Sequence, residues 1–169
     1  APKVPVVLAL AIGWLLFIYD YMNYGATPGS RIETPLGWWG WFDQSYYLLA
    51  SQNFWSGTLR AEEQFYPPLY PLVGAVLLPL SSQHSYTLPN LLLYGVYIWA
   101  FMQVFQLYLG RWLALLAICL GLFSVEILRL QWIVPWTSTL AAALTMGALF
   151  AFNRFLVRHK DPEWSVRSR

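Results

Sequence analysis

Charged side chains are scarce in this sequence, and their scarcity excludes most soluble folds. Of the 169 residues, 11% are charged, where about 25% is usual in a soluble domain. The hydrophobic fraction is 58%, against roughly 45–50% in an average soluble protein. A soluble globule needs more polar surface than this composition supplies, so we expect an all-α integral membrane protein.

Cysteine, histidine and net charge are also low, and each excludes a class of protein. The single cysteine, Cys119, lies in an apolar run, which excludes a disulfide framework or a thiolate metal site within one chain. The two histidines, His84 and His159, lie outside the apolar runs, which disfavours a haem protein with axial ligands in its spans. The net charge of +2 is too small to predict nucleic-acid binding. We expect no metal site and no nucleic-acid partner.

Aromatic residues, in contrast, are abundant. They make up 18% of the chain, with ten Trp and eleven Tyr. Trp and Tyr favour the membrane–water boundary, because the ring is apolar and one edge forms hydrogen bonds. This enrichment predicts contact with membrane lipids, some of them bound, and with other membrane subunits.

Four apolar segments are long enough to cross a membrane, which takes about 20 residues of helix. They are residues 4–21, 88–109, 112–128 and 132–157. A fifth stretch, residues 66–81, is short and holds four prolines. Proline breaks the helical hydrogen-bond ladder where lipid offers no substitute partner. We therefore expect a proline-broken half-helix there, at the membrane surface or dipping partway in.

The basic residues set the expected orientation, because Lys and Arg concentrate in cytoplasmic loops. With four spans and a cytoplasmic N-terminus, three of the ten basic residues lie outside, namely Arg31, Arg60 and Arg129. Five spans would reverse this bias. We predict one membrane domain over residues 1–157 in a bacterial inner membrane, both termini in the cytoplasm, and a basic tail over residues 158–169.

Four spans leave residues 22–87 as one large outer loop, which is long enough to build a site. Within it we expect a surface helix over residues 44–56, with Asp43 as its N-cap and Gly57 as its stop. An apolar stripe at helical spacing would lie on the membrane, formed by Tyr46, Leu49, Ala50 and Phe54.

Two motifs in this loop carry a family resemblance: residues 43–47 (Asp-Gln-Ser-Tyr-Tyr) and residues 66–71 (Tyr-Pro-Pro-Leu-Tyr-Pro). A first helix, a long outer loop and then these motifs in this order resemble the N-terminal part of the GT-C membrane glycosyltransferases. That superfamily includes protein O-mannosyltransferases and aminoarabinose transferases. The resemblance implies transfer of a sugar from a polyprenyl-phosphate donor to a hydroxyl or amine at the outer face.

The resemblance also implies roles for individual residues. Asp43 matches the proposed general base or acceptor-positioning group, and a carboxylate in reach of a hydroxyl can take its proton as the bond to the sugar forms. On chemistry alone, a simple helix cap explains Asp43 equally well. Trp38, Trp39 and Trp41 would stack on the sugar or the prenyl chain, or merely anchor the loop in the interface. The other substrate-binding candidates are Gln44, Tyr66, Arg60, Glu126 and Arg129.

The sequence departs from the family in two respects. The loop before the last span lacks the family's second acidic residue. Either Glu126 replaces it and Arg129 holds a carrier phosphate, or the two pair as neighbours three residues apart on a helix. The family's membrane module also has more than four spans, so we expect this chain not to transfer sugar unaided. The alternative is a non-catalytic accessory subunit of a larger complex that keeps the GT-C-like fold and contacts partners through residues 141–148.

Overall fold

The computed structural model describes residues 4–25, 27, 42–58, 66–82 and 84–160, and in these ranges the fold is helical, with no strand. The all-α prediction is therefore confirmed for the described part of the chain. Its elements are α1 (Val4–Asn23), α2 (Phe42–Ser56), α3 (Leu69–Leu77), α4 (Thr87–Leu109), α5 (Arg111–Ile118), the π-helical turn η2 (Cys119–Phe123), α6 (Glu126–Ile133) and α7 (Thr137–Lys160).

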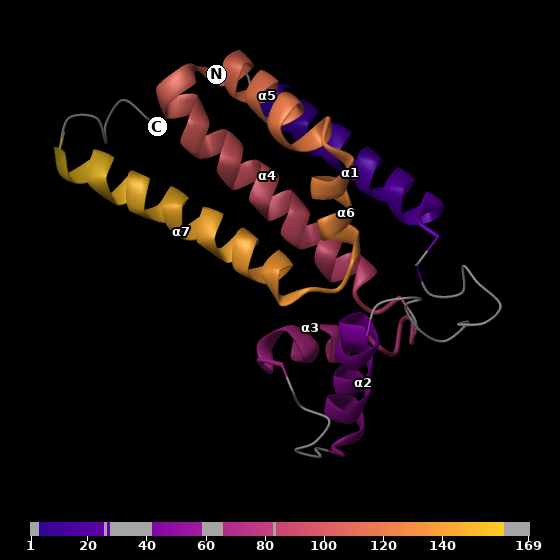
Figure 1. Ribbon diagram of the computed structural model, residues 1–169. Helices are drawn as coiled ribbons and strands as arrows, with labels where there is room; N and C mark the ends of the chain where they lie inside the picture. Colours follow the sequence, from indigo (N-terminus) through magenta and orange to yellow (C-terminus); the bar gives the residue numbers. More distant parts are fainter. Residues whose placement is uncertain (1–3, 26, 28–41, 59–65, 83, 161–169) are drawn as a thin grey trace.

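Three helices, α1, α4 and α7, are long and apolar enough to cross a membrane. The described residues give a fourth candidate if α5, η2 and α6 count as one span bent by 79°. In Figure 1, α4 and α7 run in one direction and α1 and α5 in the other, while α2 and α3 lie at the end of the bundle where α4 and α7 begin. We call this end the cap end.

Helix α1 packs through a single face. Its buried residues recur every three or four positions, which is the spacing of one helical face, and they are Pro5, Ala9, Gly13, Phe17 and Asp20. A Cβ atom added at Gly13 would lie 2.3 Å from Cδ1 of Ile98, so the glycine permits the close approach of α4. The opposite face of α1 exposes large apolar side chains, as expected for a helix in lipid.

The predicted third span, residues 112–128, is not one continuous helix. Helix α5 continues into the π-helical turn η2 and ends there. Val125 then has an extended backbone, with φ −102° and ψ 101°, before α6 begins at Glu126. The Ser124 hydroxyl donates to the Leu120 carbonyl oxygen at 2.6 Å, a back-bond that bends helices. The segment can count as one bent span, so the prediction of a third span at residues 112–128 is not confirmed and stays a prediction.

The fourth span was expected within residues 132–157, and the candidate span found there covers Thr137–Val157. Trp132 and Ile133 belong to α6, and Val134 is extended with φ −83° and ψ 137°. Proline disfavours the helical conformation of the residue before it, so Pro135 separates the two helices. The candidate span is therefore α7 alone, which begins at Thr137.

The outer-loop helices have the predicted type with different details. Helix α2 begins at Phe42, so Asp43 lies in its first turn, and the helix stops before Gly57, which has φ +74° as a helix-terminating glycine should. Helix α3 has nine residues, or about 14 Å, against the roughly 30 Å of a bilayer core. Whether α3 lies at a membrane surface stays a prediction.

The face of α2 that packs inward is formed mainly by residues outside the stripe predicted to lie on the membrane, and the membrane contact of that stripe stays a prediction. The inward face contains four buried residues that are one or two helical turns apart, namely Gln44, Tyr47, Leu48 and Ser51. Of the predicted stripe, Ala50 is buried, while Tyr46, Leu49 and Phe54 are partly exposed. The inward face packs on α3, where Gly74 meets Ser51 and Tyr86.

We expect Gly74→Ala to destabilise the packing of α2 on α3. A Cβ atom there would lie 2.5 Å from both Ser51 Oγ and Tyr86 Cζ, and overpacking of this kind costs about 1–3 kcal/mol. The loss should appear as faster hydrogen exchange in α2 and α3 of the purified protein in micelles.

The matched control for this substitution is Gly147→Ala in the middle of α7. A Cβ atom at Gly147 meets nothing within 4 Å, so exchange in α2 and α3 should stay at the wild-type rate. Equal exchange rates in the Gly74→Ala and Gly147→Ala proteins would contradict the tight packing described for Gly74.

Candidate functional site

Asp43 and Tyr66 meet at the start of α2. The Tyr66 hydroxyl donates a hydrogen bond to Oδ1 of Asp43, 23 residues earlier in the chain. The Tyr66 ring also packs against the Tyr47 ring, with centroids 4.2 Å apart. The structure therefore brings together the two motifs that carry the family resemblance, and both side chains remain partly exposed.

Gln44, the neighbour of Asp43, is fully buried with a relative exposure of 0%. Neither its Oε1 nor its Nε2 atom has a hydrogen-bond partner. An unpaired buried polar group costs about 1–3 kcal/mol, so such an amide needs an explanation, for which strain, a bound water and a catalytic role are the usual candidates. Because the side chain is fully buried, the role of Gln44 in binding a substrate stays a prediction.

Beneath Asp43, a cluster of hydroxyl groups joins α2 to α3. The Ser51 hydroxyl lies 2.5 Å from the Tyr86 hydroxyl and 2.9 Å from the carbonyl oxygens of Tyr47 and Pro71. The Tyr86 hydroxyl donates to the Tyr47 carbonyl oxygen at 3.0 Å. These contacts fix the part of α2 that follows Asp43.

Three further bonds fasten this cluster to the helical bundle. The Tyr70 hydroxyl donates to Oδ1 of Asn90 in α4 at 2.7 Å, and Asn90 Nδ2 donates to the Val134 carbonyl oxygen at 3.4 Å. The Tyr47 hydroxyl donates to Oγ1 of Thr137 in α7 at 3.2 Å. The site is thus held on the first turns of two candidate spans.

The tyrosines of the site stay protonated at neutral pH. Burial, followed by the hydrogen bond to Asp43, raises the pKa of Tyr66 above its ordinary value. Burial likewise raises the pKa of Tyr70 and of Tyr86. All three phenols are therefore hydrogen-bond donors, and Tyr66 orients the Asp43 carboxylate by donating to it.

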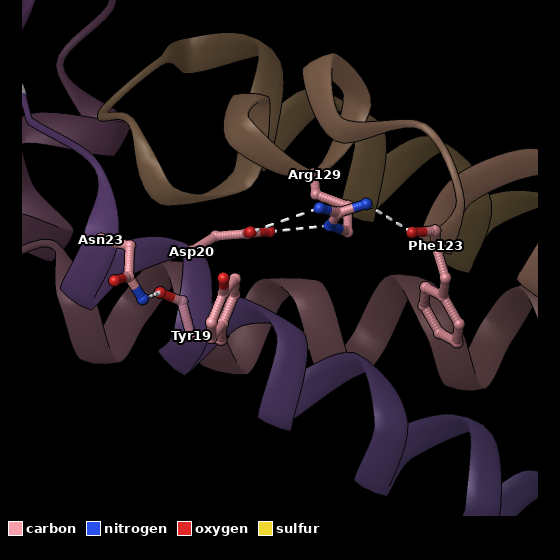
Figure 2. Close-up of polar contacts among 5 residues, drawn as sticks. All are labelled: Tyr19, Asp20, Asn23, Phe123 and Arg129. Carbon is pink, nitrogen blue, oxygen red and sulfur yellow. Dashed lines mark hydrogen bonds and ion pairs between the residues drawn. The ribbon is translucent and has the colours of Figure 1, made fainter.

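A second polar group lies between α1 and the bent segment, as Figure 2 shows. Arg129 Nε donates to Oδ2 of Asp20 at 2.8 Å, and Nη2 donates to Oδ1 at 3.3 Å. Its Nη1 donates to the Phe123 carbonyl oxygen at 2.5 Å, just before the helix breaks. The guanidinium therefore joins α6 to α1 and satisfies a carbonyl at the break.

Glu126 and Arg129 lie in one helix, but the structure pairs Arg129 with a different acidic residue. The two residues share α6, as expected, but the ion pair of Arg129 is with Asp20, 109 residues away. Glu126 is exposed. Whether Glu126 replaces a second acid, or Arg129 also contacts a phosphate, stays a prediction. The missed partner, Asp20, had a visible signal, because a carboxylate in an apolar span needs a partner.

The remaining predicted site residues are Trp38, Trp39, Trp41 and Arg60, and they lie outside the described residues. Among the described residues, no group of three His, Cys, Asp or Glu side chains is placed to hold a metal ion.

Comparison with protein-family models, with curated proteins and with solved structures finds no match to this chain. A functional proposal therefore rests on the chemistry of its own residues and on the resemblance of its two loop motifs.

Proposed function

We propose that this chain is an integral membrane protein of the GT-C type that supplies the acceptor side of a glycosyltransferase. The donor is a sugar on a polyprenyl phosphate, and the acceptor is a hydroxyl or amine. One observation carries the proposal: the Tyr66 hydroxyl donates to the Asp43 carboxylate, which unites two distant motifs at one site. The resemblance of those motifs supplies the reaction class.

The geometry suits proton abstraction from an acceptor. A hydroxyl is a poor nucleophile until a base within hydrogen-bond reach accepts its proton. Asp43 is partly exposed, and among the described residues Tyr66 bonds one of its carboxylate oxygens, Oδ1.

The membrane placement is part of the proposal. Three candidate spans and the basic bias favour a bacterial inner membrane, with both termini in the cytoplasm and the cap end at the outer face. A lipid-borne sugar would then reach Asp43 by lateral diffusion. Additional membrane segments or a partner subunit would hold the donor phosphate, because Arg129 is already paired with Asp20.

We expect Tyr66→Phe to slow sugar transfer about tenfold, the value of one charge-assisted hydrogen bond that orients the base. The assay uses native-host membranes in which the variant replaces the wild-type chain, a labelled polyprenyl-phosphate sugar and the host's own acceptors. Protein abundance should be unchanged, because the ring packing on Tyr47 is kept.

The matched control is Tyr108→Phe in α4. It removes an exposed tyrosine hydroxyl that donates a hydrogen bond to Oδ1 of Asn153 in α7. It should transfer sugar at the wild-type rate. Wild-type transfer by Tyr66→Phe would show that its bond to Asp43 has no part in the reaction.

A second candidate function, a non-catalytic subunit, is favoured by the exposure of α7. Only 6% of the part of α7 that is long and apolar enough to cross a membrane is buried within the chain. In the predicted contact stretch, Ala143 packs inside the bundle while Ala141 and Ala148 are exposed. Small exposed residues suit helix contacts in lipid. Two results together would favour this candidate. Sugar transfer in the host would survive Asp43→Asn, and the stability of this chain would depend on the presence of a partner subunit.

A further inference from the structure

The end of α7 that lies away from the cap end carries positive charge. Arg154 lies near the end of the candidate span Thr137–Val157, and Arg158 and Lys160 follow in the last turn of the helix. Figure 1 shows α7 ending at the same end of the bundle as α4. Because only 6% of the candidate span is buried within the chain, this charge lies on a helix that is mostly surrounded by membrane or by a partner.

The side chain of Arg154 is held in place by aromatic residues. Its guanidinium carbon lies 6.0 Å from the centroid of the Phe150 ring, and the Phe150 ring packs edge-on against Trp99 of α4 with centroids 4.7 Å apart. The neighbouring Asn153 accepts a hydrogen bond from the Tyr108 hydroxyl at 2.8 Å, which joins this turn of α7 to the end of α4. The guanidinium is therefore exposed, yet positioned beside the contact between α4 and α7.

No carboxylate in the described part of the chain pairs with this guanidinium. The acidic residues there are Asp20, Asp43 and Glu126, and they belong to α1, α2 and α6. Asp20 is already paired with Arg129 at 2.8 Å. Residues 161–169 add two acidic and two basic side chains, so this end of the chain keeps a net positive charge. The charge therefore suits an anion from outside the chain.

The depth of Arg154 in the membrane indicates which anion it meets. The candidate span has 21 residues, or about 32 Å of helix, which matches a hydrocarbon core of roughly 30 Å. Arg154 lies three residues before the end of that span, so its guanidinium reaches the boundary of the core on a flexible apolar stem. Phospholipid phosphates lie beyond that boundary, and a guanidinium binds a phosphate through two parallel hydrogen bonds.

We propose that Arg154, together with the basic turn that follows it, binds the phosphate of an anionic glycerophospholipid. A headgroup with a net negative charge complements the three basic residues of α7, whereas a zwitterionic headgroup brings a further positive charge to them. Each Lys or Arg near a membrane surface strengthens the binding of anionic lipid about fivefold. The inference rests on the proposed membrane placement, holds for either orientation of the chain, and does not depend on sugar transfer.

The test uses the full chain in phosphatidylcholine vesicles that contain a trace of phosphatidylglycerol with a photoreactive headgroup. After illumination, mass spectrometry of the digested protein measures label on the α7 peptide that carries residue 154. Arg154→Gln should lower this labelling about fivefold, because one basic side chain is lost. Arg154→Lys keeps the charge and should retain most of the labelling. Arg154 is exposed, so both variants should fold like wild type.

The matched control is Arg111→Gln, which removes an exposed basic residue at the start of α5. Labelling of the α7 peptide should stay close to the wild-type value. An equal fall in Arg111→Gln and Arg154→Gln would show a diffuse attraction by net charge and would overturn a site at Arg154. Equal labelling of the wild-type chain by phosphatidylcholine with the same photoreactive group would overturn it too, because negative charge would then not be recognised.

A partner protein with an acidic surface is the competing occupant of this end of α7. The same probe, incorporated into native-host membranes, separates the two. Lipid labelling of α7 in both settings supports the proposal, whereas a protein cross-linked to α7 in place of the lipid in host membranes would overturn it. Sugar transfer is not measured, so none of these results changes the proposed role of Asp43.

Discussion

Replacing Arg129 by alanine should lower the free energy of unfolding by about 3–5 kcal/mol, the usual effect of removing one partner of a buried ion pair. The side chains of Arg129 and Asp20 are 15% and 5% exposed, so Asp20 would be left charged and without its partner. The Phe123 carbonyl oxygen would also lose its donor at the helix break. Denaturant titration in mixed micelles measures the loss.

Two control proteins separate this effect from a general loss of charge. Arg154→Ala removes an exposed arginine whose guanidinium lies 6.0 Å from the Phe150 ring, and it should cost at most about 1 kcal/mol. Replacing both partners, with Asp20→Leu and Arg129→Met, should restore most of the stability, because apolar side chains can replace a buried pair. A cost below about 1 kcal/mol for Arg129→Ala would show that the pair does not hold α6 to α1.

Asp43→Asn should slow sugar transfer by at least about a hundredfold, the lower range for loss of a general base. Asparagine keeps a carbonyl oxygen that can accept from the Tyr66 hydroxyl, and in the first turn of α2 it loses only the interaction of a negative charge with the helix dipole, about 0.3–1 kcal/mol. Folding and abundance should therefore be unchanged. The measurement is the initial rate of transfer in membranes at equal protein abundance.

Glu126→Gln is the comparison for that experiment, since Glu126 is the other acidic candidate. Its side chain is exposed at the start of α6. We expect it to retain more activity than Asp43→Asn. Full activity of Asp43→Asn together with loss of activity in Glu126→Gln would show that Glu126, and not Asp43, is the acidic residue that the reaction needs.

The sequence predicts those elements whose cause is local. Helices α1 and α4 follow from uninterrupted apolar runs, and the end of α2 follows from Gly57, which adopts a positive φ of 74°. The short α3 follows from its prolines. Each of these features depends on residues that are close together in the chain.

The sequence did not predict features that depend on distant partners. The bend in the third segment needs Arg129 to reach Asp20 across 109 residues, although the charges inside an apolar run and the nearby Ser124 were visible signs of it. Asp43 and Tyr66 were both named as candidates, but their hydrogen bond depends on how α2 packs against α3. The unpaired amide of Gln44 is likewise a property of packing.

The central claim, that Asp43 serves sugar transfer from a polyprenyl-phosphate donor, is tested most directly by deletion and complementation in the native host. Membranes from the deletion strain receive a labelled polyprenyl-phosphate sugar, and label on lipid, glycan and protein acceptors is measured. We predict that transfer is lost on deletion, returns with the wild-type chain and stays absent with Asp43→Asn at equal abundance. Equal restoration by the wild-type and Asp43→Asn chains, or undiminished transfer without either, would contradict the account.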